Sequence, residues 1–154
     1  MGQASIGLLW KTIFSEGAVD MVKMEVVYTG EKHCELTHES SGSKIETDAP
    51  KDNQGRGERF SPTDLVGAAL ASCVLTTMAI VAERDGVSLT GARAQVTKEM
   101  NPQPRRIARL PITVQLPQSL PVEYRGKLEN SAHQCPVKKS LHPDIEVAMK
   151  FQYV

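Results

Sequence analysis

One long apolar run dominates the pattern of hydrophobic and polar positions along this chain. No residue between Leu65 and Val81 is charged. Just before the run, Ser61 can cap a helix whose first turn begins with proline and contains Asp64, and an acidic side chain is stabilised near the positive end of a helix. The pattern therefore predicts a helix from this cap to about Arg84. Because the helix is apolar on nearly every side, we expect it to be buried all round.

Alternation of apolar and polar residues predicts strands on both sides of this helix. The expected elements are three strands over 23–29, 33–37 and 44–47, the long helix, two strands over 89–100 and 112–116, a second helix over 121–135, and a last strand over 145–153. Strands that are interrupted by two helices indicate an α+β fold. We interpret residues 21–154 as a single domain. Residues 1–20 fit this pattern poorly and are interpreted as an N-terminal extension that is disordered or not native to the protein.

Composition narrows the class of partner. The chain has 154 residues and a formal net charge of zero, which argues against nucleic acid as a partner. The uncharged run is just under the length needed to span a bilayer, so we expect no membrane partner. Three cysteines are too few for a secreted disulfide framework, which favours a reducing compartment, the cytoplasm.

Two of these cysteines, Cys73 and Cys135, fall on predicted helices. A free cysteine is most often a small buried hydrophobic residue, so packing alone would account for either one. Two thiols on helices that pack together could instead do redox chemistry. One thiolate would attack a peroxide and become a sulfenic acid, which the other thiol would resolve as a disulfide. At this point both interpretations stay open.

A reactive thiolate needs a neighbouring cation or hydrogen-bond donor to lower its pKa. The cations nearest in sequence are Arg56 and Arg59 before the long helix, and Lys138 and Lys139 after Cys135. Metal binding is the main rival chemistry, because His and Cys occur at 33–34, 38, 133–135 and 142. No CxxC or HExxH spacing is present, so no metal site is predicted.

The stretches SPTDLVGAALASC, ending at Cys73, and CPVKKSL, beginning at Cys135, resemble the two motifs of the OsmC/Ohr family, the osmotically inducible and organic hydroperoxide resistance proteins. The resemblance extends in element order over about 21–154. It implies an OsmC-like α+β fold, with antiparallel sheets around a long buried central helix and active sites at the interface of an intertwined homodimer. It also implies thiol-dependent reduction of organic hydroperoxides, with Cys73 as peroxidatic thiol and Cys135 as resolving thiol. No bound cofactor is implied, and the reductant would be an external lipoyl-type dithiol.

The sequence departs from the family pattern at two points. Hydroperoxide reductases of the family carry a Glu ten residues before the first cysteine, where this chain has Thr63. They also use an Arg from the N-terminal strand region, and residues 21–54 contain none. Glu58 and Arg59 are candidates for the missing pair of charges. The alternative functions are an OsmC-like dimer that binds an apolar small molecule or acts in stress without significant peroxidase turnover, and a purely structural dimer.

Overall fold

The computed structural model describes residues 21–154, so the predicted extension over 1–20 lies outside the described residues. Contacts divide the chain into one unit that ends at Thr47 and a second unit over Asp48–Val154. The interpretation of 21–154 as a single domain stays a prediction.

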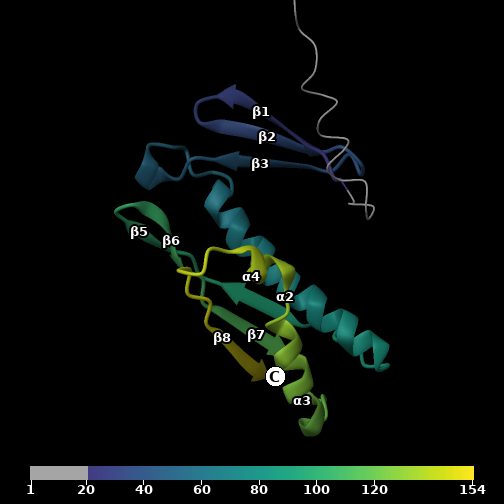
Figure 1. Cartoon of the computed structure of the whole chain (residues 1–154). Helices are drawn as coiled ribbons and strands as arrows, with labels where there is room; N and C mark the ends of the chain where they lie inside the picture. The colour runs from purple at the N-terminus through teal and green to yellow at the C-terminus, as the bar shows by residue number, and fades with distance from the viewer. Residues whose placement is uncertain (1–20) are drawn as a thin grey trace, which may run out of the picture. The chain divides into compact units, whose positions relative to one another are not determined.

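The first unit carries a three-stranded antiparallel sheet in the order β1-β2-β3 (Figure 1). Its strands are β1 (Met24–Gly30), β2 (His33–His38) and β3 (Lys44–Asp48), as the alternating pattern predicts. Gly30 has a φ of +103° at the end of β1, a backbone conformation that glycine adopts without strain. Cys34 lies in β2, opposite Tyr28 of β1.

The second unit begins with a short 3-10 helix, η1 (Lys51–Asn53), followed by the long helix α2 (Pro62–Arg84) (Figure 1). α2 has the predicted bounds and the predicted start. The Ser61 hydroxyl accepts a hydrogen bond from the backbone N–H of Asp64, and the Asp64 carboxylate accepts one from the backbone N–H of Ser61. This reciprocal capping box satisfies donors that the first turn of a helix otherwise leaves unpaired.

The main sheet of the second unit has the order β4-β7-β8, with β4 (Arg93–Val96), β7 (Ile112–Leu116) and β8 (Met149–Tyr153). β4 pairs with β7 antiparallel, but β7 pairs with β8 parallel. The expectation of antiparallel sheets throughout is therefore wrong. The physical reason is the connection from β7 to β8, which runs through two helices, as a crossover between parallel strands requires.

Four strands separate the long helix from the second helix, where the sequence pattern indicated two. The additional hairpin pairs β5 (Glu99–Pro102) with β6 (Arg105–Arg109). Arginines occupy three of the five positions of β6, and this composition hid the alternation on which the prediction depended. The predicted second helix is α3 (Val122–Ala132), and the chain then begins a new short helix, α4 (Pro136–Ser140).

α2 packs against α3, β4 and α4 within the second unit (Figure 1). Its buried residues recur every three or four positions, so they form one face of the helix: Gly67, Leu70, Ala71, Val74, Met78 and Ala82. On the opposite side Ile80 is 47% exposed. The expectation that α2 is buried all round is therefore wrong within this chain, because the sheet and the two shorter helices cover only one of its faces.

By its length and hydropathy alone, α2 could also be a membrane-spanning helix. Its 23 residues are long and apolar enough to cross a membrane, which corrects the expectation that the run is too short. Such a helix is weak evidence by itself, since the core helix of a soluble protein meets the same criteria. The central position of α2 and the homodimer stay predictions.

Candidate active site: two thiols from separate helices

The structure brings Cys73 and Cys135 together. Cys73 lies in the middle of α2, and Cys135 is the residue that caps α4, where Pro136 begins the new helix. Cys135 is fully buried in the hydrophobic core, and Cys73 is partly buried and packs against that core. The thiol of Cys135 donates a hydrogen bond to the sulfur of Cys73. Two residues 62 positions apart in the sequence therefore lie together at the edge of the hydrophobic core.

Contacts between α3 and α2 hold the second helix in place. The Tyr124 hydroxyl donates a 2.6 Å hydrogen bond to the Asp85 carboxylate at the end of α2, and the Lys127 ammonium contacts the same carboxylate at 2.5 Å. The hydrogen bond to Asp85 raises the pKa of Tyr124 to about 12, so its hydroxyl stays a donor. Leu128 and Ala132 on α3 are fully buried. Because α3 is fixed at both a polar and an apolar contact, the chain that follows it delivers Cys135 to α2.

The surroundings of Cys73 favour its thiolate. Burial raises the pKa of Cys73, but hydrogen bonds from the Cys135 thiol, the backbone N–H of Val137 and the Thr77 hydroxyl outweigh burial, and the pKa is lowered. The Thr77 oxygen lies 4.0 Å from the Cys73 sulfur. Hydrogen bonds to a charged form stabilise that form. Of the two thiols, Cys73 is therefore the one whose ionised form its surroundings favour.

Cys135 has the opposite balance. Burial raises its pKa, and so does the hydrogen bond that its thiol donates to Cys73, while backbone N–H groups of Lys138 and Val137 act against them. The net pKa is raised, so Cys135 holds its proton more strongly than an ordinary thiol. The two pKa values are thus shifted in opposite directions, so Cys73 loses its proton more readily than Cys135.

Sequence reasoning placed the lowering of the thiol pKa on a cation, and the structure places it elsewhere. Within residues 21–154, the groups that lower the Cys73 pKa are a thiol, a backbone N–H and a hydroxyl, all of them uncharged. The role of Val137 was missed because it is a main-chain role that any residue type can fill. The available signal was the proline after Cys135, since a helix that restarts there turns its first N–H groups toward the sulfurs.

Glu58 and Arg59 line a different cavity, of about 550 Å³, at the start of α2. Backbone N–H groups of both residues donate to the Asp48 carboxylate, at 2.9 Å and 3.1 Å. Cys73 is not part of this cavity wall, which includes Gly67 and Ala68 of α2. The chain as described does not bring Glu58 and Arg59 to Cys73, and their supporting role stays a prediction.

The position of the family's glutamate, Thr63, belongs to a network centred on Lys98. The Lys98 ammonium donates to the Thr63 hydroxyl at 2.9 Å and to the Ser61 hydroxyl at 3.2 Å, and it contacts the Asp64 carboxylate at 2.5 Å. The cation at this end of α2 is therefore Lys98, which is already paired with the Asp64 carboxylate. Sequence reasoning missed Lys98 because it lies between two strands, 35 residues from Thr63.

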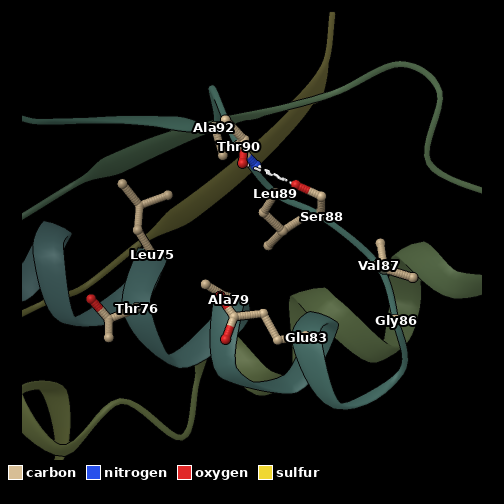
Figure 2. Close-up of a pocket in the computed structure, with 10 residues that line it drawn as sticks. All are labelled: Leu75, Thr76, Ala79, Glu83, Gly86, Val87, Ser88, Leu89, Thr90 and Ala92. Carbon is tan, nitrogen blue, oxygen red and sulfur yellow. Dashed lines mark hydrogen bonds between the residues drawn. The ribbon is translucent and has the colours of Figure 1, made fainter.

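A further cavity of about 490 Å³ lies between α2 and the segment that leads to β4 (Figure 2). Leu75, Ala79 and Glu83 line it from α2, and Leu89 faces them from the segment. Figure 2 also shows the hydrogen bond from the Thr90 backbone N–H to the Ser88 hydroxyl, 3.2 Å long. This cavity faces a side of α2 that does not carry Cys73, so it is not part of the thiol site. Residues 21–154 contain no group of three or more His, Cys, Asp or Glu side chains suited to a metal ion.

The chain therefore has an α+β fold in which a thiol in the middle of α2 meets a thiol at the start of α4. The family profile described as OsmC-like protein matches residues 55–150, which include both thiols. A structure from Psychrobacter arcticus 273-4, of a protein assigned to the osmotic stress induced and detoxification response, is similar with 41% identity and a TM-score of 0.82 over 86% of this chain and 96% of that one. The chain belongs to the OsmC-like family.

Two more distant structures share the fold. An organic hydroperoxide resistance protein OsmC from Legionella pneumophila has 17% identity and a TM-score of 0.69 over 88% of this chain and 99% of its own. The organic hydroperoxide resistance protein OhrB of Bacillus subtilis has 19% identity and a TM-score of 0.61 over 86% and 98%. No protein with a curated description matches this sequence.

Proposed function

We propose that this protein is a thiol-dependent peroxidase that reduces organic hydroperoxides through Cys73, with Cys135 as the resolving thiol. The observation that carries the proposal is the hydrogen bond between the two sulfurs, together with the opposite shifts of their pKa values. A nucleophile with a lowered pKa next to a thiol that keeps its proton suits both steps of the reaction. Membership of the OsmC-like family supports the same activity.

The first step oxidises Cys73. Its thiolate attacks the terminal oxygen of the hydroperoxide, the O–O bond breaks, and the alkoxide leaves and takes up a proton to become an alcohol. The sulfur is then a sulfenic acid. In the second step the Cys135 sulfur attacks the Cys73 sulfur, an S–S bond forms, and the hydroxide leaves as water with the proton of Cys135. An external lipoyl-type dithiol restores both thiols and becomes a disulfide itself.

The apolar surroundings of the pair favour organic peroxides over hydrogen peroxide. Val66 and Val137 pack against the same core as Cys73, and Cys135 is part of that core. An alkyl or aryl peroxide gains free energy when its apolar part leaves water beside such side chains, whereas hydrogen peroxide has no apolar part. We therefore expect cumene hydroperoxide to be consumed faster than hydrogen peroxide.

The test is peroxide consumption by the intact chain and by two single variants, with dihydrolipoamide as reductant. Cys73→Ser is expected to lower consumption by about 10³-fold or more, the usual scale for loss of a nucleophile. Cys34→Ser is the matched control, because this third thiol lies in the other unit, and it should leave consumption unchanged. Peptide mapping after one equivalent of peroxide should find a disulfide between Cys73 and Cys135. Unchanged consumption in Cys73→Ser would contradict the proposal.

One observation favours a second candidate function, the binding of a small apolar molecule without peroxidase turnover. The cavity of about 550 Å³ at the start of α2 has Phe60, Val96 and Ala68 in its wall together with Arg59, and Cys73 is absent from that wall. Pockets of this size and mixed character hold small ligands. A ligand that raises the melting temperature equally in the intact chain and in Cys73→Ser, in the absence of peroxide consumption, would favour this second function.

A further inference from the structure

A small basic cavity lies beside Cys135, between the end of α3, the helix α4 and the segment that leads toward β8. Its volume is about 290 Å³. Four basic side chains line it, His133, Lys138, Lys139 and His142, with Leu141 as an apolar neighbour. No aspartate or glutamate occurs anywhere in residues 130–143. In a chain whose net charge is zero, this is a local concentration of positive charge around a concave surface.

The hydrogen bonds around the cavity leave this charge available. The Lys139 ammonium donates a 2.8 Å hydrogen bond to the Gln134 side-chain oxygen, a neutral partner that does not cancel its charge. Within residues 21–154, neither Lys138 nor Lys139 forms an ion pair with a carboxylate. The cavity therefore presents two ammonium groups that a ligand's anion can contact.

The acidic side chain of Asp144, which follows Pro143 of the cavity wall in sequence, has partners of its own. Its carboxylate contacts Arg106 at 3.1 Å and lies 3.6 Å from the Nδ1 atom of His142. The same Nδ1 accepts a hydrogen bond from the Asp144 backbone N–H at 3.2 Å, so the ring proton of a neutral His142 sits on Nε2, which is left as a donor. Arg106 thus offsets the charge of Asp144, and the site stays suited to an anion.

The first turn of α4 contributes both to the cavity wall and to the surroundings of the thiol pair. Lys138 lines the cavity with its side chain, and its backbone N–H points to the sulfur of Cys135. A molecule whose anion is held by Lys138 and Lys139 is thus held next to the residue that forms the disulfide. The cavity volume lies at the lower limit for small-molecule pockets, about 300 Å³. A cavity of this size suits a small organic molecule better than part of another protein.

We propose that this basic cavity, lined by His133, Lys138, Lys139 and His142, binds the carboxylate of a small organic dithiol that reduces the Cys73–Cys135 disulfide. The inference rests on the proposed function and specifies its reductant. The reductant's thiolate attacks one sulfur of the disulfide, the S–S bond breaks, and the released thiolate takes up a proton. The second thiol of the reductant then displaces the mixed disulfide, so two electrons pass to the protein and the reductant becomes a cyclic disulfide.

The first experiment compares two reductants that differ only in the anion. The disulfide is formed with diamide, without peroxide, and its reduction is followed by stopped flow with dihydrolipoate and with dihydrolipoamide. At low salt dihydrolipoate should react about five- to tenfold faster at limiting concentration, and this advantage should shrink as salt screens the lysines. The double variant Lys138→Gln/Lys139→Gln should lose the advantage, so that the two reductants react with it at equal rates. Lys150→Gln, an exposed lysine outside the cavity, is the matched control. Equal rates for the two reductants in the intact chain would overturn the proposal.

The second experiment separates this inference from the peroxidase proposal. Oxidised lipoate and lipoamide are titrated into the reduced protein, and the imidazole signals of His133 and His142 are followed by NMR. Lipoate alone should shift these signals, and the double lysine variant should abolish the shift, whether or not the protein consumes peroxide. Identical responses to both molecules would overturn the anion site even if peroxidase activity is found. A shift by lipoate without any peroxide consumption would leave the anion site standing and contradict the peroxidase.

Discussion

Two helices of the second unit begin with the same sequence pattern, a capping residue followed by proline, but the hydrogen-bond donors of their first turns have different partners. α2 begins with Ser61 followed by proline, and α4 begins with Cys135 followed by proline. At α2 the capping oxygen accepts the backbone N–H of Asp64, so the helix satisfies its own first turn. At α4 the capping residue has no side-chain hydrogen bond of this kind. Instead, N–H groups of its first turn act on the sulfurs of Cys73 and Cys135.

The same local pattern therefore stabilises a helix at α2 and acts on two thiols at α4. An oxygen cap with an acid in the first turn uses the helix terminus to hold the helix. A sulfur at the same position leaves the terminus able to stabilise a thiolate. The two helix starts also differ in charge. Lys98 forms an ion pair with Asp64 at the start of α2, whereas only uncharged groups among the described residues lower the Cys73 pKa.

The largest expected effect comes from giving α4 the kind of cap that α2 has. In Cys135→Ser the disulfide cannot form, so continuous peroxide turnover should fall by about 10²-fold or more, although Cys73 can still be oxidised once. Trapping with dimedone should detect a persistent sulfenic acid on Cys73. Full turnover in this variant would show that Cys135 is not the resolving thiol.

A smaller effect is expected at the start of α2. Ser61→Ala removes the capping oxygen and should lower the free energy of unfolding by about 1 kcal/mol, measured by urea denaturation. Ser72→Ala, at an exposed position on the same helix, is the matched control and should change it by less than about 0.5 kcal/mol. The alkylation rate of Cys73 should be the same in both variants. A loss of thiol reactivity in Ser61→Ala alone would contradict the claim that the cap of α2 acts on stability and not on the thiols.

The ion pair at α2 predicts a pH dependence of stability. Burial raises the pKa of Asp64, but hydrogen bonds from Lys98 and Ser61 and the charge of Lys98 outweigh it, so the folded pKa lies below the ordinary 3.8. The contribution to stability is therefore fully present above the unfolded pKa and is lost as the pH falls through the folded pKa. Urea midpoints measured from pH 5 downward should fall less steeply in Asp64→Asn than in the intact chain. Parallel curves would rule out this role.

The smallest effect is expected at Thr77, whose hydroxyl is a weak partner of Cys73 at 4.0 Å. Thr77→Val keeps the shape and removes the donor, so the Cys73 pKa should rise and its alkylation rate at pH 7 should fall about twofold. Thr77→Ser, which retains the hydroxyl, is the control. An unchanged rate in the valine variant would leave Cys135 and Val137 as the donors that matter.

Much of this architecture was predictable from local pattern. The cap at Ser61 and the uncharged run after it fixed the bounds of α2, and alternation located β1, β2, β3 and β7. The charge-rich strand β6 was not predictable, since Arg105 and its neighbours carry no alternation. Parallel pairing of β7 with β8 depends on how the helices between them pack, which is a tertiary property.

The candidate site was also only partly predictable from the sequence. Cys73 and Cys135 were identifiable as residue types on two helices, but their contact depends on where α3 docks. The donors that lower the Cys73 pKa include the main chain of Val137, which no side-chain pattern encodes. Lys98 was likewise invisible, because its partners at the start of α2 are remote in sequence.

The most direct test of the account is the pH dependence of Cys73 alkylation, measured by mass spectrometry with iodoacetamide in the intact reduced chain and in Cys135→Ala. We predict that Cys73 in the intact chain titrates below an ordinary thiol, and that its pKa rises when the Cys135 donor is removed. A Cys73 pKa at or above that of an ordinary thiol, unchanged in the variant, would contradict the claim that the second thiol activates the first.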